Sequence, residues 1–214
     1  YQERTLNLEV AKALKEKLEN LGYKVIMTRN TDQDVVNVYH PMGSATMAND
    51  TKSKFSLAIH HNSFEYKVDS LKGLEVYIAN DTNTDFAELL VSEITKNANT
   101  IPSTKETYQL SLGIYQRFFT EQDIGEDLGF WNTDMIYYYY IREVGGVSTH
   151  AAQDGIYRPN YPKNEHYLSN NTAEPYLLEL GYMNNETDLA NIINNRDGYA
   201  EGIASAIEKY LEEE

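Results

Sequence analysis

The fold is decided by the stretch FSLAIHHNS, residues 55–63. Its first five residues are mostly apolar, a length that suits a buried parallel strand, and two histidines and an asparagine follow directly. Open α/β sheets bind their ligands at the carboxyl ends of strands, so we expect the chemistry at this strand end. Because successive side chains point to opposite faces, a regular strand directs only one of His60 and His61 to a given site. The alternative is a structural histidine held by hydrogen bonds.

Helical and strand patterns alternate on both sides of this stretch. Apolar residues at helical spacing predict a first helix over residues 6–21, and Gly22 is placed to end it. The patterns further predict strands at residues 23–28, 74–79 and 175–182, and helices at residues 86–94, 187–193 and 199–211. Thr187 is the predicted cap of the helix that begins there.

This alternation predicts the fold class and the domain organisation. It indicates an α/β protein with a mostly parallel twisted sheet, flanked by helices on both faces. Because the chain opens with a helix, we expect the first strand of the sheet to lie before Tyr1. The 214 residues show no internal repeat and no linker, so residues 1–214 are read as one domain. Residues 99–148 follow no single period and mix glycines with aromatic clusters, which makes them a candidate insertion or groove elaboration.

Composition excludes several classes of function. The chain has 18 Lys and Arg against 33 Asp and Glu, a formal net charge of −15 that repels nucleic acids. It contains no run of about 18 apolar residues, so no transmembrane helix is predicted. No glycine-rich phosphate loop supports nucleotide binding. Since cysteine is absent, a metal site has to use His, Asp or Glu.

A single carboxylate interrupts the apolar run PYLLELGY at residues 175–182. Burying a carboxylate in a strand costs several kcal/mol unless it is paired, hydrogen-bonded or protonated. Glu179 is therefore a candidate catalytic residue. The alternative, equally supported by the strand alone, is a structural partner for Arg29 or Arg158.

Five segments together resemble the type-3 family of zinc-dependent N-acetylmuramoyl-L-alanine amidases. In chain order they are residues 3–8 with the helix that follows, 22–32, 48–49, 58–62 and 178–185. The resemblance extends over residues 1–95 and 165–213, and the ordered set is far more specific than any one segment.

The resemblance implies a zinc site and a catalytic glutamate. The family's zinc ion is held by a histidine of a Gly-His-Gly loop, a glutamate that starts the first helix, and the first histidine of an Ile-His-x-Asn strand end. By position, Glu3 and His60 are the implied zinc ligands and Glu179 is the implied catalytic residue. Asn62 is a candidate for orienting His60 or binding substrate, with a strand-end turn residue as the alternative.

The Gly-His-Gly segment has no match in the numbered chain. We therefore expect the third ligand of the single zinc ion to be a histidine upstream of Tyr1. His40, His150 and His166 are the substitutes that the sequence offers, although nothing in it places them near His60.

The implied reaction is hydrolysis of the amide between N-acetylmuramic acid and L-alanine in peptidoglycan. The expected partners are the glycan strand and its stem peptide, and the expected location of such an autolysin-like hydrolase is secreted, in the cell wall. One alternative is a non-catalytic cell-wall-binding or structural domain that retains the amidase fold. Another is a zinc carboxypeptidase or deacetylase that acts on other amides.

Overall fold

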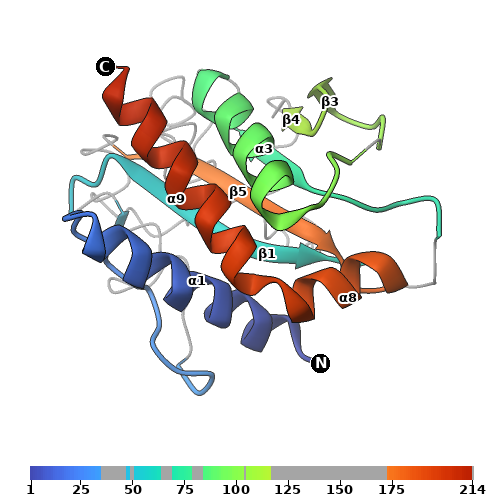
Figure 1. Cartoon of the computed structure of the whole chain (residues 1–214), viewed down its shortest axis with the longest axis horizontal. Coiled ribbons are helices and arrows are strands. Elements are labelled where there is room, and N and C mark those ends of the chain that lie inside the picture. Colours follow the sequence, from blue (N-terminus) through green and yellow to red (C-terminus); the bar gives the residue numbers. More distant parts are fainter. Residues whose placement is uncertain are drawn as a thin grey trace, which may run out of the picture.

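The computed structural model describes residues 1–34, 47–48, 51–63, 69–78, 84–103, 105–116 and 173–213. These residues form a single sheet with helices packed against it (Figure 1). The sheet order is β1 (Phe55–Asn62), β5 (Glu174–Tyr182), β2 (Glu75–Ile78), β4 (Ile114–Gln116) and β3 (Gln109–Ser111).

The sheet is mixed. Strand β1 pairs with β5 in parallel and β2 with β4 in parallel, whereas the β2–β5 and β3–β4 pairs are antiparallel. The predicted α/β class is confirmed. Strand β5 lies between β1 and β2, and eight of its nine residues are buried, as its apolar sequence requires.

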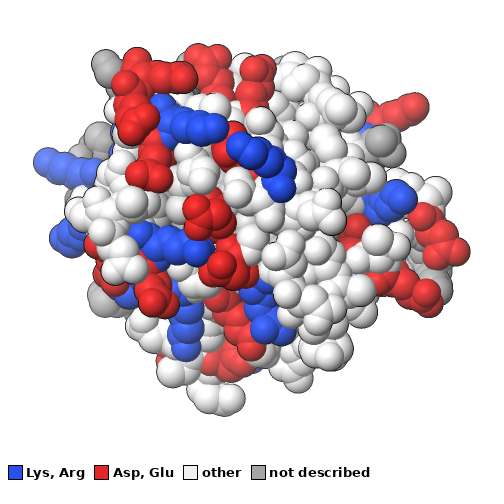
Figure 2. All heavy atoms as spheres, viewed as in Figure 1, with Lys and Arg blue, Asp and Glu red and all other residues white. Residues whose placement is uncertain are grey.

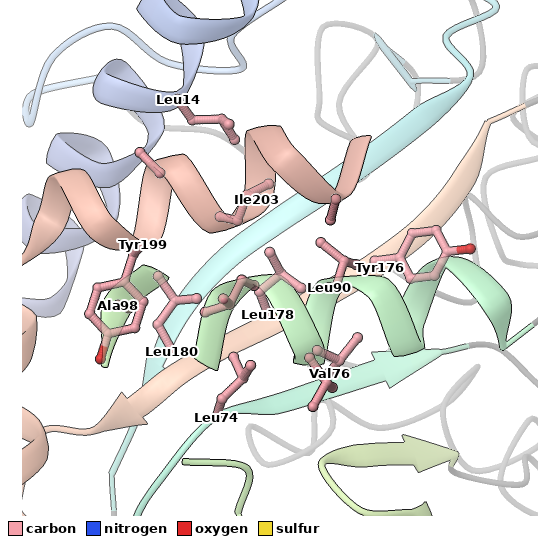
Figure 3. Close-up of a cluster of buried hydrophobic side chains, with 14 of the residues drawn as sticks. Leu14, Leu74, Val76, Leu90, Ala98, Tyr176, Leu178, Leu180, Tyr199 and Ile203 are labelled. Atoms are coloured by element: carbon pink, nitrogen blue, oxygen red, sulfur yellow. The ribbon is translucent and has the colours of Figure 1, made fainter. Parts of the chain in front are cut away.

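Three long helices lie side by side across one face of the sheet (Figure 1). They are α1 (Glu3–Asn20), α9 (Arg196–Glu212) and α3 (Asp85–Ala98), with α9 in the middle and in contact with both others. The short helix α8 (Glu186–Asn194) connects β5 to α9. Figure 3 shows the core between these layers, where Leu14, Ile203 and Leu90 of the helices meet Leu178 and Val76 of the sheet.

The predicted strand at residues 23–28 is wrong, because this segment pairs with no strand that the structure describes. Its side chains nonetheless alternate between half-buried and exposed positions, and Tyr23 and Val25 pack against the core. An alternating pattern reports burial on one side, whereas a strand also requires a hydrogen-bonded neighbour. A groove of about 760 Å³ lies between this segment, α1 and β1.

Within the candidate insertion or groove elaboration at residues 99–148, residues 109–116 form β3 and β4 at one end of the strand order. The remainder of that segment, from residue 117, lies outside the described residues. Helix α8 is capped by Asn185 and not by Thr187, because the Asn185 side chain accepts hydrogen bonds from the backbone N–H groups of Thr187 and Asp188.

Acidic and basic side chains are intermixed on the helical face (Figure 2). Lys17 of α1 bridges to α9, with its Nζ 3.0 Å from Asp197 and 2.9 Å from Glu201. Such exposed pairs contribute about 0–1 kcal/mol each, so the packing of α1 on α9 depends mainly on apolar contacts.

We expect Gly202→Ala to destabilise the protein, although alanine is the better helix former. A Cβ at Gly202 would lie 2.5 Å from Cα of Ile94 and 2.8 Å from the carbonyl oxygen of Glu93, so α9 and α3 would have to separate. Overpacking typically costs about 1–3 kcal/mol, which outweighs the gain of about 1 kcal/mol in helix propensity. Urea unfolding measures the change, and Ser205→Ala on the same helix is the control, with an expected change under about 0.5 kcal/mol. A stabilised Gly202→Ala protein would contradict the close packing.

Candidate functional site

The side chains of His60, Glu179 and Glu75 form one row across three adjacent strands, β1, β5 and β2. The register of β1 and β5 sets His60 opposite Glu179, and the register of β5 and β2 sets Glu179 opposite Glu75. Residues directly opposite each other on paired strands project from the same face. The row therefore brings a candidate ligand, the candidate catalytic residue and a further carboxylate together.

Helix α1 brings Glu3 to this row. Its Oε1 accepts hydrogen bonds from Nδ1 of His60 at 2.9 Å, from the backbone N–H of His61 at 3.2 Å and from Nδ2 of Asn7 at 3.1 Å. Burial alone would raise the pKa of Glu3, but the hydrogen bonds and the charge of His60 outweigh it and lower the pKa to about 2. Glu3 is therefore a carboxylate anion, the form that binds a metal.

His61 also contacts α1, since its Nδ1 lies 2.5 Å from Oδ1 of Asn7. The pairing register shifts between His60 and Asn62, where β5 has one residue more than β1. His60 and His61 contact Glu3 and Asn7, which are one turn apart on α1. His61 is buried, and burial lowers its pKa to about 4, so the imidazole is neutral at pH 7. Its Nε2 has no hydrogen-bond partner among the described residues.

Glu179 is buried at the centre of the row, and its Oε2 has no hydrogen-bond partner among the described residues. Burial raises the pKa of Glu179 well above its usual value, and the nearby charges of Glu3 and Glu75 raise it further. The alternative role as partner of Arg29 does not hold, because Arg29 donates to Asp32 at 3.2 Å and to a backbone carbonyl of α1. Arg158 lies outside the described residues.

Sequence reasoning missed Glu75. It is fully buried, and its Oε2 accepts a hydrogen bond from Nδ2 of Asn62 at 3.3 Å. Asn62 also accepts from the backbone N–H of Ser63 through Oδ1. The missed signal was a carboxylate in the apolar run LEVYIA at residues 74–79, the same signal that singles out Glu179.

The chain just beyond Glu179 is held by Asp188. Its Oδ2 accepts from the backbone N–H groups of Gly73 at 2.7 Å and Tyr182 at 2.9 Å, which ties the start of β2 to the end of β5. Gly181 has φ +151°, and a Cβ there would lie 3.2 Å from the same oxygen. Glycine is thus required for the approach of Asp188.

The donor set at Glu3 and His60 fits a metal in part. A carboxylate oxygen and an imidazole nitrogen are ordinary zinc ligands, and here they already meet at 2.9 Å. No group of three His, Asp or Glu side chains that could enclose an ion occurs among the described residues. The substitutes His40, His150 and His166 lie outside them. The groove beside β1 reaches both Glu3 and His60.

The sequence of this chain matches a known protein family. A family model of N-acetylmuramoyl-L-alanine amidases, amidase type 3, matches residues 1–116, more than half of the chain. The chain belongs to this family. By family it is an enzyme, an amidase of the peptidoglycan cell wall.

Solved amidase structures share the fold. The catalytic domain of CwlV from Bacillus (Paenibacillus) polymyxa var. colistinus is 19% identical, with 99% of this chain and 86% of that chain covered and a TM-score of 0.62. AmiC2 of Nostoc punctiforme is 20% identical, with 98% and 84% covered and a TM-score of 0.64. Ami1 from Mycobacterium smegmatis is 18% identical, with 100% and 79% covered and a TM-score of 0.63. No curated protein matches the chain.

The amidase shows no membrane-spanning helix within the part of the chain that the structure describes. Each helix there is too short or too polar to cross a bilayer.

Replacing Asp188 with Ala should destabilise the amidase by about 2–4 kcal/mol, because two buried N–H groups would lose their acceptor. Asp188→Asn keeps one carbonyl oxygen at the same position, so this variant should lose clearly less stability than Asp188→Ala. Thermal and urea unfolding of the two variants measure the difference. Equal stability of Asp188→Ala and the parent protein would show that Asp188 does not hold the end of β5.

Proposed function

We propose that this amidase catalyses zinc-dependent hydrolysis of the amide between N-acetylmuramic acid and L-alanine in peptidoglycan. The supporting observation is a carboxylate–histidine pair, Glu3 and His60, beside a buried carboxyl group with an unpartnered oxygen, Glu179. Family membership adds the substrate class.

Glu3 and His60 are proposed to hold the zinc ion. Glu3 is already an anion in the folded protein, because three donors stabilise its charge. A zinc ion polarises the scissile carbonyl and acidifies water. His61 is set aside as a ligand because its Nδ1 is engaged by Asn7 and its ring is buried.

The third ligand is proposed to be a histidine upstream of Tyr1. The groove between residues 23–29 and β1 supports this assignment, since Glu3 and His60 both line it. An extended segment lying in the groove would bring a third donor to the other two. Three protein ligands with one open position make a normal catalytic zinc site.

Glu179 is proposed to move the proton. Its unpartnered Oε2 would accept a proton from the attacking water and deliver it to the leaving amine of L-alanine. A carboxyl group whose pKa burial has raised suits this task, because it retains the proton until the amine accepts it. Glu3 cannot take this role, since its pKa of about 2 makes it a weak base.

The proposed substrate implies the partners and the location of the amidase. The glycan strand and the stem peptide are the proposed partners, and the secreted, cell-wall location is the proposed site of action. With a net charge of −15 the amidase is not drawn to anionic wall polymers, so targeting has to come from other contacts. Substrate binding by Asn62 stays a prediction.

One observation favours a second candidate function. Because only two ligands are present among the described residues, a non-catalytic wall-binding domain with an incomplete metal site is the alternative. Measuring the zinc content of the natural protein distinguishes the enzyme from the wall-binding domain. Mass spectrometry identifies the N-terminus of the protein that is measured. One zinc per chain, with a histidine found before Tyr1, supports the enzyme. Product analysis separates it from a carboxypeptidase or deacetylase, because an amidase releases intact stem peptides from intact glycan.

Replacing Glu179 with Gln should leave folding and zinc content unchanged and lower hydrolysis by a factor of about 10² or more. The amide retains the size of the side chain but cannot accept and return the proton. Release of stem peptides from purified peptidoglycan measures the loss. Turnover at the parental rate would remove Glu179 from catalysis.

Replacing His60 with Ala should lower both the bound zinc and the activity of the natural protein. His61→Gln is the matched control, because it changes the adjacent histidine and should leave the zinc content close to one per chain. Elemental analysis of folded, dialysed samples gives the result. Loss of zinc in His61→Gln but not in His60→Ala would reverse the assignment.

A further inference from the structure

Glu75 is the most completely satisfied carboxylate in the described part of the amidase. Its side chain is 0% exposed. Oε1 accepts hydrogen bonds from the hydroxyl groups of Tyr182 and of Ser103, the latter at 3.0 Å. Oε2 accepts from the hydroxyl of Tyr77 at 2.7 Å and from Nδ2 of Asn62 at 3.3 Å. All four are bonds that the two oxygens of a carboxylate can accept.

One cation accompanies this buried anion. Lys105 Nζ lies 3.5 Å from Oε2 of Glu75 and donates to the hydroxyl of Tyr77 at 2.9 Å. Removing a carboxylate from water costs several kcal/mol, and a complete set of donors with a nearby ammonium group offsets it. An apolar residue would have been the simpler choice for stability alone.

The donors come from the strands that carry the reacting groups. Asn62 ends β1, two residues beyond His60, and Tyr182 ends β5, three residues beyond Glu179. Glu75 itself begins β2 and faces Glu179 directly. Its two oxygens therefore join the ends of three neighbouring strands beside the row of His60, Glu179 and Glu75.

Glu179 has no comparable set of donors. Its Oε2 is unpartnered among the described residues, so this side chain cannot anchor itself. Its position depends on the backbone of β5, which Tyr182 and Asp188 hold at the carboxyl end.

We propose that Glu75 is a positioning residue of the amidase: through Asn62 and Tyr182 it anchors the ends of β1 and β5 and so fixes Glu179 relative to His60. This inference rests on the proposed function, because it assigns Glu179 the catalytic role. Small displacements of a catalytic group lower kcat without weakening substrate binding.

The tyrosines that bond Glu75 provide a matched pair of variants. Tyr182→Phe and Tyr77→Phe each remove one buried hydroxyl donor from Glu75, but only Tyr182 belongs to the strand of Glu179. Tyr77 belongs to β2, the strand of Glu75 itself. Tyr77→Phe also removes the acceptor of Lys105, so it should lose at least as much stability as Tyr182→Phe, whereas only Tyr182→Phe should lower kcat.

The experiment measures kcat and KM on purified peptidoglycan with the zinc-loaded natural protein. We expect kcat to fall by about 10-fold in Tyr182→Phe and by about 10- to 100-fold in Glu75→Gln, with KM and zinc content unchanged. Tyr77→Phe should stay within about 2-fold of the parent protein. Equal losses in the two tyrosine variants, or unchanged kcat in Tyr182→Phe and Glu75→Gln, would overturn the proposal.

A second measurement reports position without turnover. The carboxyl ¹³C resonance of Glu179, assigned by its disappearance in Glu179→Gln, should shift in Tyr182→Phe and remain in place in Tyr77→Phe. An identical resonance in all three proteins would overturn the positioning role. If the parent protein releases no stem peptide, the proposed function fails, while this resonance still tests whether Glu75 fixes Glu179.

Discussion

Two buried carboxylates, Glu75 and Glu179, stand opposite each other on adjacent strands at the centre of the sheet. Neither can be accommodated by the apolar core alone, because desolvation opposes both charges and their mutual repulsion adds to it. The two carboxyl groups have different surroundings in the structure. Glu75 receives four hydrogen bonds and a nearby lysine, whereas Glu179 has a raised pKa and an oxygen that no described residue contacts through a hydrogen bond.

That asymmetry fits the roles proposed for the two groups. A carboxylate that is fully hydrogen-bonded stabilises the chain around it. A carboxyl group without partners retains its proton affinity and can exchange a proton with a substrate. The same row of the sheet therefore contains one carboxyl group with four donors and one with an oxygen that has no partner among the described residues, and the difference comes from their neighbours.

The sequence predicted the elements better than their pairing. The side chains of residues 23–28 do alternate between half-buried and exposed positions. This alternation does not require hydrogen bonds to a neighbouring strand, and none of the described strands pairs with the segment. Glu179 was found because it lies within a long apolar strand, whereas Glu75 is the second residue of a run of six and resembles a strand end. The partners of Glu75 come from segments up to 107 residues away, a relation that no local pattern contains. The family resemblance singled out Glu3 and His60, and their contact across 57 residues required the folded chain.

Helix α1 contributes to the candidate site through the spacing of its side chains and through its N-terminal end. Glu3 and Asn7 are one turn apart on α1 and contact His60 and His61. The first turn of a helix favours a negative charge, and the donors around Glu3 strengthen that preference. His61, kept neutral by burial, adds no opposing positive charge. The packing of α1 against β1 therefore places a fixed anion beside His60 in the folded chain, which is the arrangement that the proposed metal site requires.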